Sequence, residues 1–247
     1  MKITIIIPTY NEAENLLLLV EAIQAQKVPG LHILIVDDMS PDGTGEIADG
    51  LARRYKNMEV LHRQGPRGLG RAYIYGFDHV LRGDSQIIGQ MDCDFSHPPD
   101  KLPELVAKLA ESDLALGSRY IPGGSVDQKW PLWRKALSRW GNFYARTILG
   151  LPVKDVTGAF RLWRRELLEK VPYQQVVSSG YVFLYEILYL AHRAGARFGE
   201  VPFYFADRKF GQSKMRFGVQ IEAALRVWQV RWRYRNWRPG VKISATR

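Results

Sequence analysis

Short apolar segments alternate with segments of helical pattern along the first half of this chain, and this alternation restricts the folds open to it. Five segments are rich in aliphatic and β-branched residues: 3–7, 32–38, 58–62, 86–92 and 113–119. Helical patterns separate them at about residues 12–26 and 44–55, and again from about residue 70. Strands that alternate with helices form βαβ units, so the sequence predicts an α/β fold with a mainly parallel sheet flanked by helices.

Polar residues directly follow three of these apolar segments. The clusters are Pro8-Thr9-Tyr10, Asp37-Asp38 and Asp92-Cys93-Asp94. In open parallel sheets, ligands bind outside the carboxyl ends of the strands. We therefore expect the three clusters to meet at one edge of the sheet and to form a single site.

Asp92 and Asp94 predict a metal site at that edge. If the strand continues through them, their side chains project together while Cys93 points away. Two carboxylates in one small space are costly to keep ionised unless a cation lies between them, and Mg²⁺ and Mn²⁺ prefer oxygen ligands. Pro98 and Pro99 would then end the ladder and leave the carboxylates at the edge. Because Asp-x-Asp alone also arises by chance on surfaces, its position after an apolar strand carries this prediction.

Charge and composition limit the partners. The 247 residues carry a net charge of +10, which favours nucleic acid, nucleotides or an anionic membrane surface. The single cysteine permits no intramolecular disulfide and indicates a reducing, cytoplasmic setting. The apolar run at the N-terminus ends at Pro8, which argues against a signal peptide, and no segment approaches the roughly 18 apolar residues of a membrane span. We expect a soluble or peripherally bound protein.

A nicotinamide oxidoreductase and a nucleic-acid-binding protein are the alternatives from other functional classes. The oxidoreductase needs G-x-G-x-x-G after the first strand, where this chain has "PTYNEAEN". The later "GPRGLGRA" (65–72) could meet a phosphate, but an ordinary glycine-rich turn is an equally good interpretation. The charge and the interleaved Arg and Trp favour nucleic acid, whereas the carboxylate-rich site and the lack of a recognised nucleic-acid module weigh against it.

The second half of the chain is rich in Trp, Arg and Lys on helical spacing. Residues 129–151 are predicted to form a helical cover over the core, and residues 222–240 a basic helix with no acid after Glu222. Three tryptophans and five arginines lie on that last segment: Trp228, Trp232, Trp237, Arg226, Arg231, Arg233, Arg235 and Arg238. Such a helix suits the headgroup boundary of an anionic membrane, although its tryptophans could instead pack on the protein itself.

Seven segments are specific when taken together: "IIIPTYNEAENL", "IVDDMSPDGT", "GLGRAYIYGF", "MDCDFSHPP", "LGSRY", "DVTGAFRLWRRELL" and "GYVFLYEILYLAHRAGARFGEVPFYFADRKFGQSKM". In order and spacing they resemble the dolichol-phosphate (polyprenol-monophosphate) mannosyltransferases of glycosyltransferase family 2. The resemblance implies a GT-A (Rossmann-like) catalytic domain in residues 1–218, followed by the basic C-terminal helix and tail in residues 219–247, with no transmembrane segment.

The resemblance also implies a reaction, which is the transfer of mannose from GDP-mannose to a polyprenyl (dolichyl) phosphate, with a metal ion and with inversion at the anomeric carbon. The same reaction with another donor, such as UDP-glucose, is the nearest alternative. Because the acceptor lies in a bilayer, we expect the chain to bind the cytoplasmic face of a membrane peripherally, or to reach it through a membrane partner subunit.

Site residues follow from the same resemblance. The donor would be bound by Pro8, Tyr10, Glu12, Val36, Asp38, Met91, Asp92, Cys93, Asp94 and Arg119. Mg²⁺ or Mn²⁺ would be held by Asp92, Asp94 and Ser96, and some relatives have Gln where this chain has Ser96. Arg208 and Lys214 would reach the diphosphate from a loop, and Arg134 would face the acceptor phosphate.

Elementary chemistry agrees with this assignment. A phosphate monoester has a second pKa of about 6, so the acceptor is already an oxyanion at neutral pH and needs no general base. The harder task is to stabilise the leaving diphosphate, for which a metal and fixed cations are suited. We therefore regard Asp94, Arg208 and Lys214 as the candidate catalytic residues. Glu186 is either catalytic or a helix carboxylate that anchors a neighbour.

Overall fold

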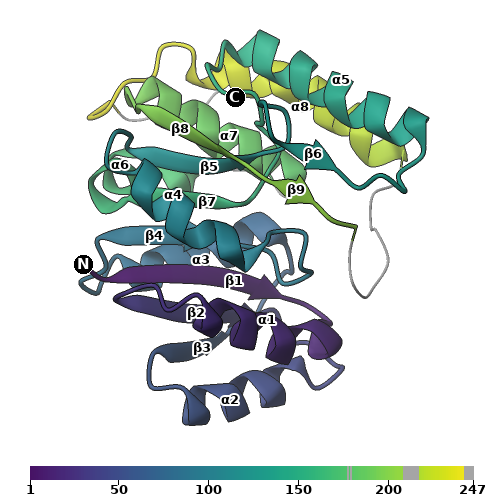
Figure 1. Ribbon diagram of the computed structural model, residues 1–247. Helices are drawn as coiled ribbons and strands as arrows, with labels where there is room; N and C mark the ends of the chain where they lie inside the picture. Colours follow the sequence, from purple (N-terminus) through teal and green to yellow (C-terminus); the bar gives the residue numbers. More distant parts are fainter. Residues whose placement is uncertain (177, 179, 208–216, 242–247) are drawn as a thin grey trace.

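The computed structural model describes residues 1–176, 178, 180–207 and 217–241, and a twisted sheet forms its centre (Figure 1). In this part of the chain the sheet has seven strands in the order β3-β2-β1-β4-β7-β5-β8. Their bounds are β1 Ile3–Thr9, β2 Leu31–Asp37, β3 Met58–His62, β4 Ile87–Gln90, β5 Leu114–Ser118, β7 Arg161–Arg164 and β8 Phe198–Pro202. Two short strands, β6 Ser125–Val126 and β9 Tyr204–Phe205, pair with each other in a second sheet.

The large sheet is parallel except at β7. β1 lies between β2 and β4, β2 pairs with β3, and β5 pairs with β8, all in parallel. β7 lies between β4 and β5 and runs antiparallel to both. The prediction of a mainly parallel sheet is confirmed. The sequence did not indicate β7, because its four residues, RLWR, begin and end with arginine.

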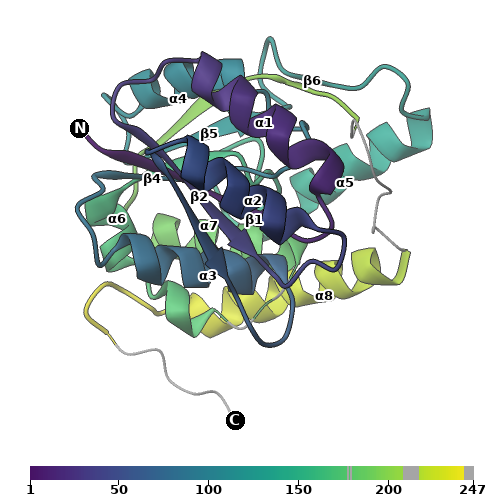
Figure 2. The same cartoon turned by 90° about the horizontal axis from the view of Figure 1, so that it is seen from below.

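Helices cover both faces of the sheet. Their bounds are α1 Ala13–Ala25, α2 Thr44–Arg54, α3 Leu69–Val80, α4 Leu102–Lys108, α5 Leu132–Leu149, α6 Arg165–Lys170, α7 Tyr181–Arg193 and α8 Phe217–Tyr234. Figure 2 separates α1 and α4 on one side of the sheet from α3 and α8 on the other. Alternate residues of β1 enter the two cores, since Ile5 and Ile7 pack with α1 and α4 while Ile6 packs with α3. A strand buried on both faces is nearly all apolar, which explains the segment 3–7.

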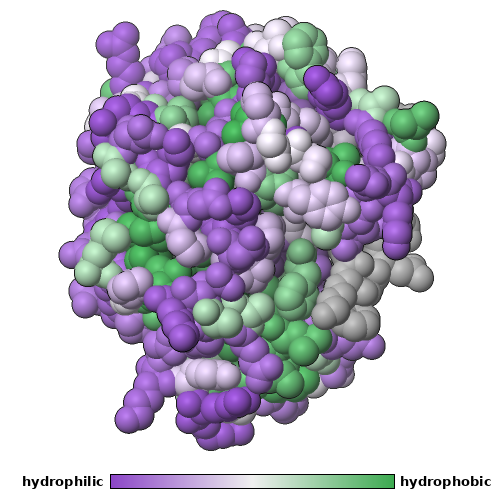
Figure 3. Space-filling view, viewed as in Figure 1, coloured by the Kyte–Doolittle hydropathy of each residue, from purple (hydrophilic) through white to green (hydrophobic). Residues whose placement is uncertain are grey.

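α5 and α8 pack side by side at one end of the molecule (Figure 1). Val227, Val230 and Tyr234 of α8 are buried in a core that includes residues of α7, whereas Trp228 and Trp232 are exposed. Apolar side chains also reach the surface at the end of α5, at the upper right of Figure 3. None of the described helices has both the length and the apolar character needed to cross a bilayer.

The basic C-terminal helix forms, although earlier in the chain than the predicted 222–240. α8 begins at Phe217 and ends at Tyr234, so the predicted domain boundary at residue 218 falls within its first turn. Trp237 follows the helix and is buried. Of the three tryptophans, one therefore packs on the protein itself and two face outward.

Candidate active site

The polar clusters that follow β1, β2 and β4 meet at one edge of the sheet. The backbone N–H of Asp38 donates to the carbonyl of Thr9 at 3.0 Å, and the N–H of Met91 donates to the carbonyl of Ile6 at 3.2 Å. The chain leaves β1 toward β2 on one side, while β4 lies on the other. This arrangement is the topological switch point at which α/β sheets bind ligands.

The segment between Met91 and His97 is a tight turn rather than the end of a strand. β4 ends at Gln90, so the expectation that strand alternation orients the two aspartates is wrong. Phe95 adopts a left-handed conformation, with φ of 62°, which is uncommon for a residue with a side chain. That turn brings Ser96 back to Asp94, whose Oδ1 accepts hydrogen bonds from the Ser96 N–H at 3.1 Å and from the Ser96 hydroxyl at 2.6 Å.

Asp92 is fixed by residues from two directions. Its Oδ1 accepts a hydrogen bond from the hydroxyl of Tyr73, on α3, at 3.2 Å. Its backbone N–H donates to Nδ1 of His97 at 2.9 Å, so the neutral ring of His97 carries its proton on Nε2. Burial and the charge of Asp92 raise the pKa of the Tyr73 phenol well above its usual value. The phenol therefore stays protonated and remains a hydrogen-bond donor.

His97 and Cys93 support the turn from inside. His97 is buried and stacks on Phe160, with 5.1 Å between ring centroids. Burial lowers the pKa of His97, although the charges of Asp92 and Asp94 act in the opposite direction. Burial also raises the pKa of the Cys93 thiol well above its usual value, so this cysteine is a small buried residue and not a thiolate.

The donor set of this turn fits a hard divalent cation completed by substrate. Asp92 and Asp94 supply carboxylate oxygens and Ser96 a hydroxyl, all within five residues. Within the described residues, no group of three or more His, Cys, Asp or Glu side chains is arranged to hold a metal ion. Mg²⁺ commonly binds through one or two carboxylates plus substrate phosphates, so the turn suits a metal that arrives with a diphosphate.

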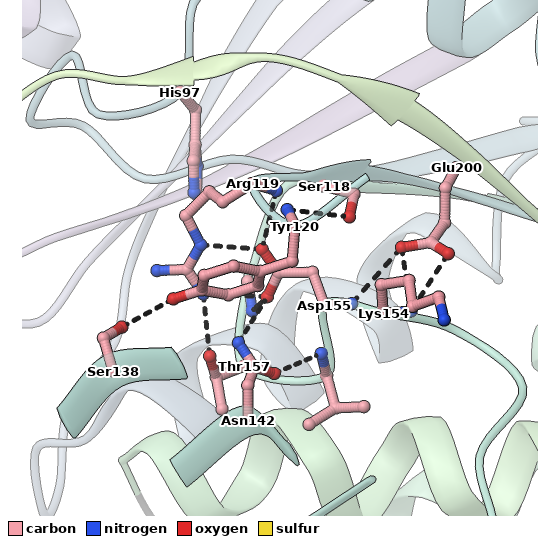
Figure 4. Close-up of polar contacts among 12 residues, drawn as sticks. His97, Ser118, Arg119, Tyr120, Ser138, Asn142, Lys154, Asp155, Thr157 and Glu200 are labelled. Atoms are coloured by element: carbon pink, nitrogen blue, oxygen red, sulfur yellow. Dashed lines mark hydrogen bonds and ion pairs between the residues drawn. The ribbon is translucent and has the colours of Figure 1, made fainter. Parts of the chain in front are cut away.

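A buried ion pair holds Arg119 beside this turn (Figure 4). Arg119 directly follows β5, and its Nε and one terminal nitrogen donate to the two oxygens of Asp155 at 2.7 and 2.8 Å. Its backbone N–H also donates to Asp155, and its guanidinium reaches the hydroxyl of Thr157 at 2.7 Å. Burial alone would raise the pKa of Asp155, but the charge and hydrogen bonds of Arg119 outweigh it and hold that pKa below the usual value. Both partners are therefore charged at neutral pH.

Asp155 also ties α5 and β8 to the same place. The side-chain amide of Asn142, on α5, donates to Asp155 at 3.4 Å and accepts from the N–H of Val156 at 2.8 Å. Glu200, on β8, accepts the backbone N–H groups of Lys154 and Asp155 (Figure 4). Asp155 was missed in the sequence because its partner lies 36 residues away; its only sequence signal was its place in the segment "DVTGAF".

The residues predicted to bind the nucleoside lie near one another but differ in exposure. Tyr10 and Glu12 follow β1 and are half-buried, as is Pro8. The side chains of Val36 and Met91 are buried in the two cores. Any contact of those two residues with a ligand would therefore come from their backbone.

Asp38 holds the turn between β3 and α3. Its Oδ1 accepts from Nε of Arg63 at 2.6 Å, and its Oδ2 accepts from the backbone N–H of Gly68 at 3.0 Å. A terminal nitrogen of Arg63 also donates to the carbonyl of Pro66 at 2.9 Å. The segment 63–68 is thereby fixed against the end of β2.

The remaining predicted residues lie toward α5 or outside the described part. Arg134, in the first turn of α5, lies over the ring of Trp130 at 3.7 Å, and its guanidinium is 3.5 Å from Asp207. Arg208 and Lys214 lie outside the described residues, so their roles stay predictions. The sequence did not single out Arg161, which is fully buried and donates to two backbone carbonyls; burial lowers its pKa to about 10.

Glu186 acts as an anchor between helices. Its Oε1 accepts a hydrogen bond from the hydroxyl of Tyr234, on α8, at 2.5 Å, and both residues are buried. Burial and the charge of Glu186 raise the pKa of Tyr234. Of the two interpretations of Glu186, this contact supports the structural one.

Known proteins agree with the fold and the sequence motifs. Residues 4–172 match the family described as Glycosyl transferase family 2. A polyprenol monophosphomannose synthase of Mycolicibacterium smegmatis is 44% identical over 233 residues, which cover 93% of this chain and 87% of the relative. An undecaprenyl-phosphate mannosyltransferase of Micrococcus luteus is 40% identical over 232 residues, which cover 94% of each.

Solved structures show the same fold at low sequence identity. The glucosyl-3-phosphoglycerate synthase of Mycobacterium tuberculosis, in complex with Mn²⁺, uridine diphosphate and phosphoglyceric acid, superposes with a TM-score of 0.64 and 18% identity over 93% of this chain and 76% of that one. Its complex with Mg²⁺ and uridine diphosphate gives the same TM-score and identity over 93% and 77%. The sequence resemblance and the GT-A-like fold are thus confirmed, and the chain belongs to glycosyltransferase family 2 as a mannosyltransferase of the polyprenol-phosphate group.

Proposed function

We propose that this enzyme transfers mannose from GDP-mannose to a polyprenyl phosphate, giving polyprenyl phosphate mannose with inversion at the anomeric carbon. The observation that carries the proposal is the turn 91–97, where two carboxylates and a serine hydroxyl gather at the switch point of the sheet. The names of the two curated relatives support the acceptor and the sugar. The donor base rests on the family resemblance.

The residues of the turn would hold the donor through its diphosphate. Asp92, Asp94 and Ser96 would bind Mg²⁺ or Mn²⁺, which when bound offsets the negative charge of the leaving diphosphate. The Tyr73 hydroxyl keeps Asp92 in place, and Ser96 keeps Asp94 in place. The turn is therefore organised before the donor arrives, which lowers the cost of reorganisation during reaction.

Two arginines suit the phosphate groups of the reaction. Arg119 is fixed by Asp155 and cannot swing away, so it offers a positioned positive charge. Arg134 lies at the start of α5, where an acceptor phosphate would approach. An oxygen of that phosphate attacks the anomeric carbon, the bond from that carbon to the GDP oxygen breaks, and GDP leaves. A single displacement of this kind inverts the configuration.

Incubation of the enzyme with a polyprenyl phosphate, Mg²⁺ or Mn²⁺ and each of GDP-mannose, UDP-glucose and UDP-N-acetylglucosamine tests the proposal. Mass spectrometry of the lipid fraction identifies the product. We expect polyprenyl phosphate mannose from GDP-mannose, and none when a chelator is in excess. Faster transfer from either UDP-sugar would reassign the donor.

The acceptor lies in a bilayer, and the paired helices α5 and α8 offer a surface for membrane contact. Trp133 of α5 and Trp232 of α8 are 67% and 62% exposed, and further exposed apolar or aromatic side chains accompany them: Leu132, Trp140, Phe143, Leu225 and Trp228. Exposed arginines lie on the same helices or just after them: Arg139, Arg231, Arg235 and Arg238. Tryptophan suits the headgroup region, and each basic residue near an anionic surface contributes about 1 kcal/mol.

We therefore propose peripheral binding to the cytoplasmic membrane face through this helix pair, with a membrane partner subunit as the alternative. Sedimentation with anionic and neutral vesicles at low salt tests it. The double variant Trp133→Ser/Trp232→Ser should lose binding to anionic vesicles, while Leu17→Ser/Leu18→Ser, which removes two exposed apolar side chains from α1, should not. Equal binding by wild type and the tryptophan variant would contradict this surface.

A further inference from the structure

Arg67 and Tyr10 form a pair that the reaction described above does not use. Tyr10 directly follows β1, and Arg67 lies in the turn between β3 and α3. The Arg67 guanidinium lies over the Tyr10 ring, 4.2 Å from its centroid, and a terminal nitrogen donates to the Tyr10 hydroxyl. An exposed arginine is thus held on the ring of a residue at the edge of the proposed donor site.

The backbone on both sides of Arg67 is fixed. The Arg63 side chain binds the carbonyl of Pro66, and the N–H of Gly68 binds the buried carboxylate of Asp38. Gly68 has φ of 154°, in the region that favours glycine. Arg67 therefore projects from a rigid turn, and its position relative to Tyr10 is set by the fold.

The order of the strands places this pair at the far end of the site from the metal-binding turn. Along the sheet edge, the order β3-β2-β1-β4 sets the turn 63–68, Asp38, Tyr10 and Asp92 side by side. A nucleoside diphosphate whose phosphates lie at Asp92 and Asp94, and which runs along this edge, has its base at Tyr10 and Arg67. This step rests on the proposed function.

We propose that Arg67 binds the O6 and N7 atoms of guanine and thereby determines that the donor is a guanine nucleotide. Those two atoms are neighbouring acceptors that match the two donors of an arginine fork. Uracil offers only the O4 acceptor on the corresponding edge, and adenine presents an amino donor in place of O6. The Tyr10 ring supplies an aromatic surface against which the base and the guanidinium can lie.

Calorimetric binding of GDP, 7-deaza-GDP, ADP and UDP in the presence of Mn²⁺ tests the inference. Wild type should bind GDP most tightly and lose affinity for the 7-deaza analogue, which lacks the N7 acceptor. Arg67→Ala should weaken GDP binding roughly 5- to 150-fold, the range for one bidentate arginine–guanine pair, with little change for UDP. Arg67→Lys keeps the charge but lacks the fork, so it should also lose most of the preference.

Arg53→Ala is the matched control, because Arg53 is an exposed arginine in the last turn of α2 and its loss changes the net charge equally. It should leave the ratio of GDP to UDP affinity unchanged. If wild type prefers GDP and Arg67→Ala keeps the same ratio, the inference is overturned while the proposed donor stands. If wild type binds UDP as tightly as GDP, the proposed donor and the inference both fall.

Discussion

Replacing Asp155 by alanine should destabilise the folded enzyme by about 3–5 kcal/mol, the usual cost of removing one partner of a buried ion pair. Asp155 is 1% exposed and accepts hydrogen bonds from three nitrogen atoms of Arg119. The variant leaves the Arg119 guanidinium buried without a counter-charge, and it removes the acceptor for Asn142 and for the N–H of Gly158. Because these losses share one site, they do not add, and the estimate is kept at the value for the pair.

Urea unfolding at pH 7, followed by tryptophan fluorescence, measures this loss. Asp113→Ala is the control, because Asp113 receives Nε and a terminal nitrogen of Arg197 at 3.0 and 2.8 Å, in the same bidentate geometry but at the surface. Exposed pairs contribute little, so its loss should be clearly smaller. The double variant Asp155→Leu/Arg119→Met should recover much of the stability, since apolar residues commonly replace a buried pair without cost. Equal losses in Asp155→Ala and Asp113→Ala would refute the reasoning.

The same ion pair predicts a pH dependence. The pKa of Asp155 is lowered in the folded protein, so its contribution to the free energy of unfolding is fully present above the unfolded value of about 3.9. That contribution is lost as the pH falls through the lower pKa of the folded state. The stability difference between wild type and Asp155→Ala should therefore be constant from pH 7 to about 5 and shrink in more acidic solution. A difference that grows toward acid would contradict the assigned direction.

Three further predictions concern the reaction and the helix anchor. Asp94→Asn should abolish transfer while circular dichroism stays unchanged; full activity of this variant would remove the carboxylate from the metal site. Arg208→Ala and Lys214→Ala should each lower kcat more than they weaken donor binding, because fixed cations act mainly on the leaving diphosphate, and unchanged kcat in both would make them surface charges. Tyr234→Phe should lower the free energy of unfolding by about 1–3 kcal/mol in urea, because it deprives the buried Glu186 carboxylate of its donor; an unaltered midpoint would show that the contact is unimportant.

The sequence predicted the part of the fold that depends on local pattern. Segment 3–7 is apolar because β1 is buried on both faces, and this property is visible without a structure. β7 was not predicted, because a strand of four residues ending in two arginines is stable only between two neighbours already in place. Its position in the sheet is a tertiary property.

The candidate site shows the same division. Asp92 and Asp94 could be placed at the sheet edge, since that follows from strand order. Their orientation could not be predicted, because it depends on the left-handed turn at Phe95 and on hydrogen bonds from Tyr73 and Ser96. The role of Asp155 likewise required the fold, because a bidentate pair across 36 residues leaves no periodic signal.

The central place of β7 has a consequence for the order in which the chain acquires structure. β4 and β5 have no backbone ladder with each other, and each is bonded to β7. During synthesis, residues 1–118 can complete β1 to β5, yet the sheet stays in two pieces with open edges until residues 161–164 emerge. Open strand edges attract other chains, so the interval between these two points is when the nascent enzyme is most exposed to aggregation. A ribosome pause placed before residue 161 would prolong that interval, whereas one placed after residue 164 would come when β7 can already join the two pieces.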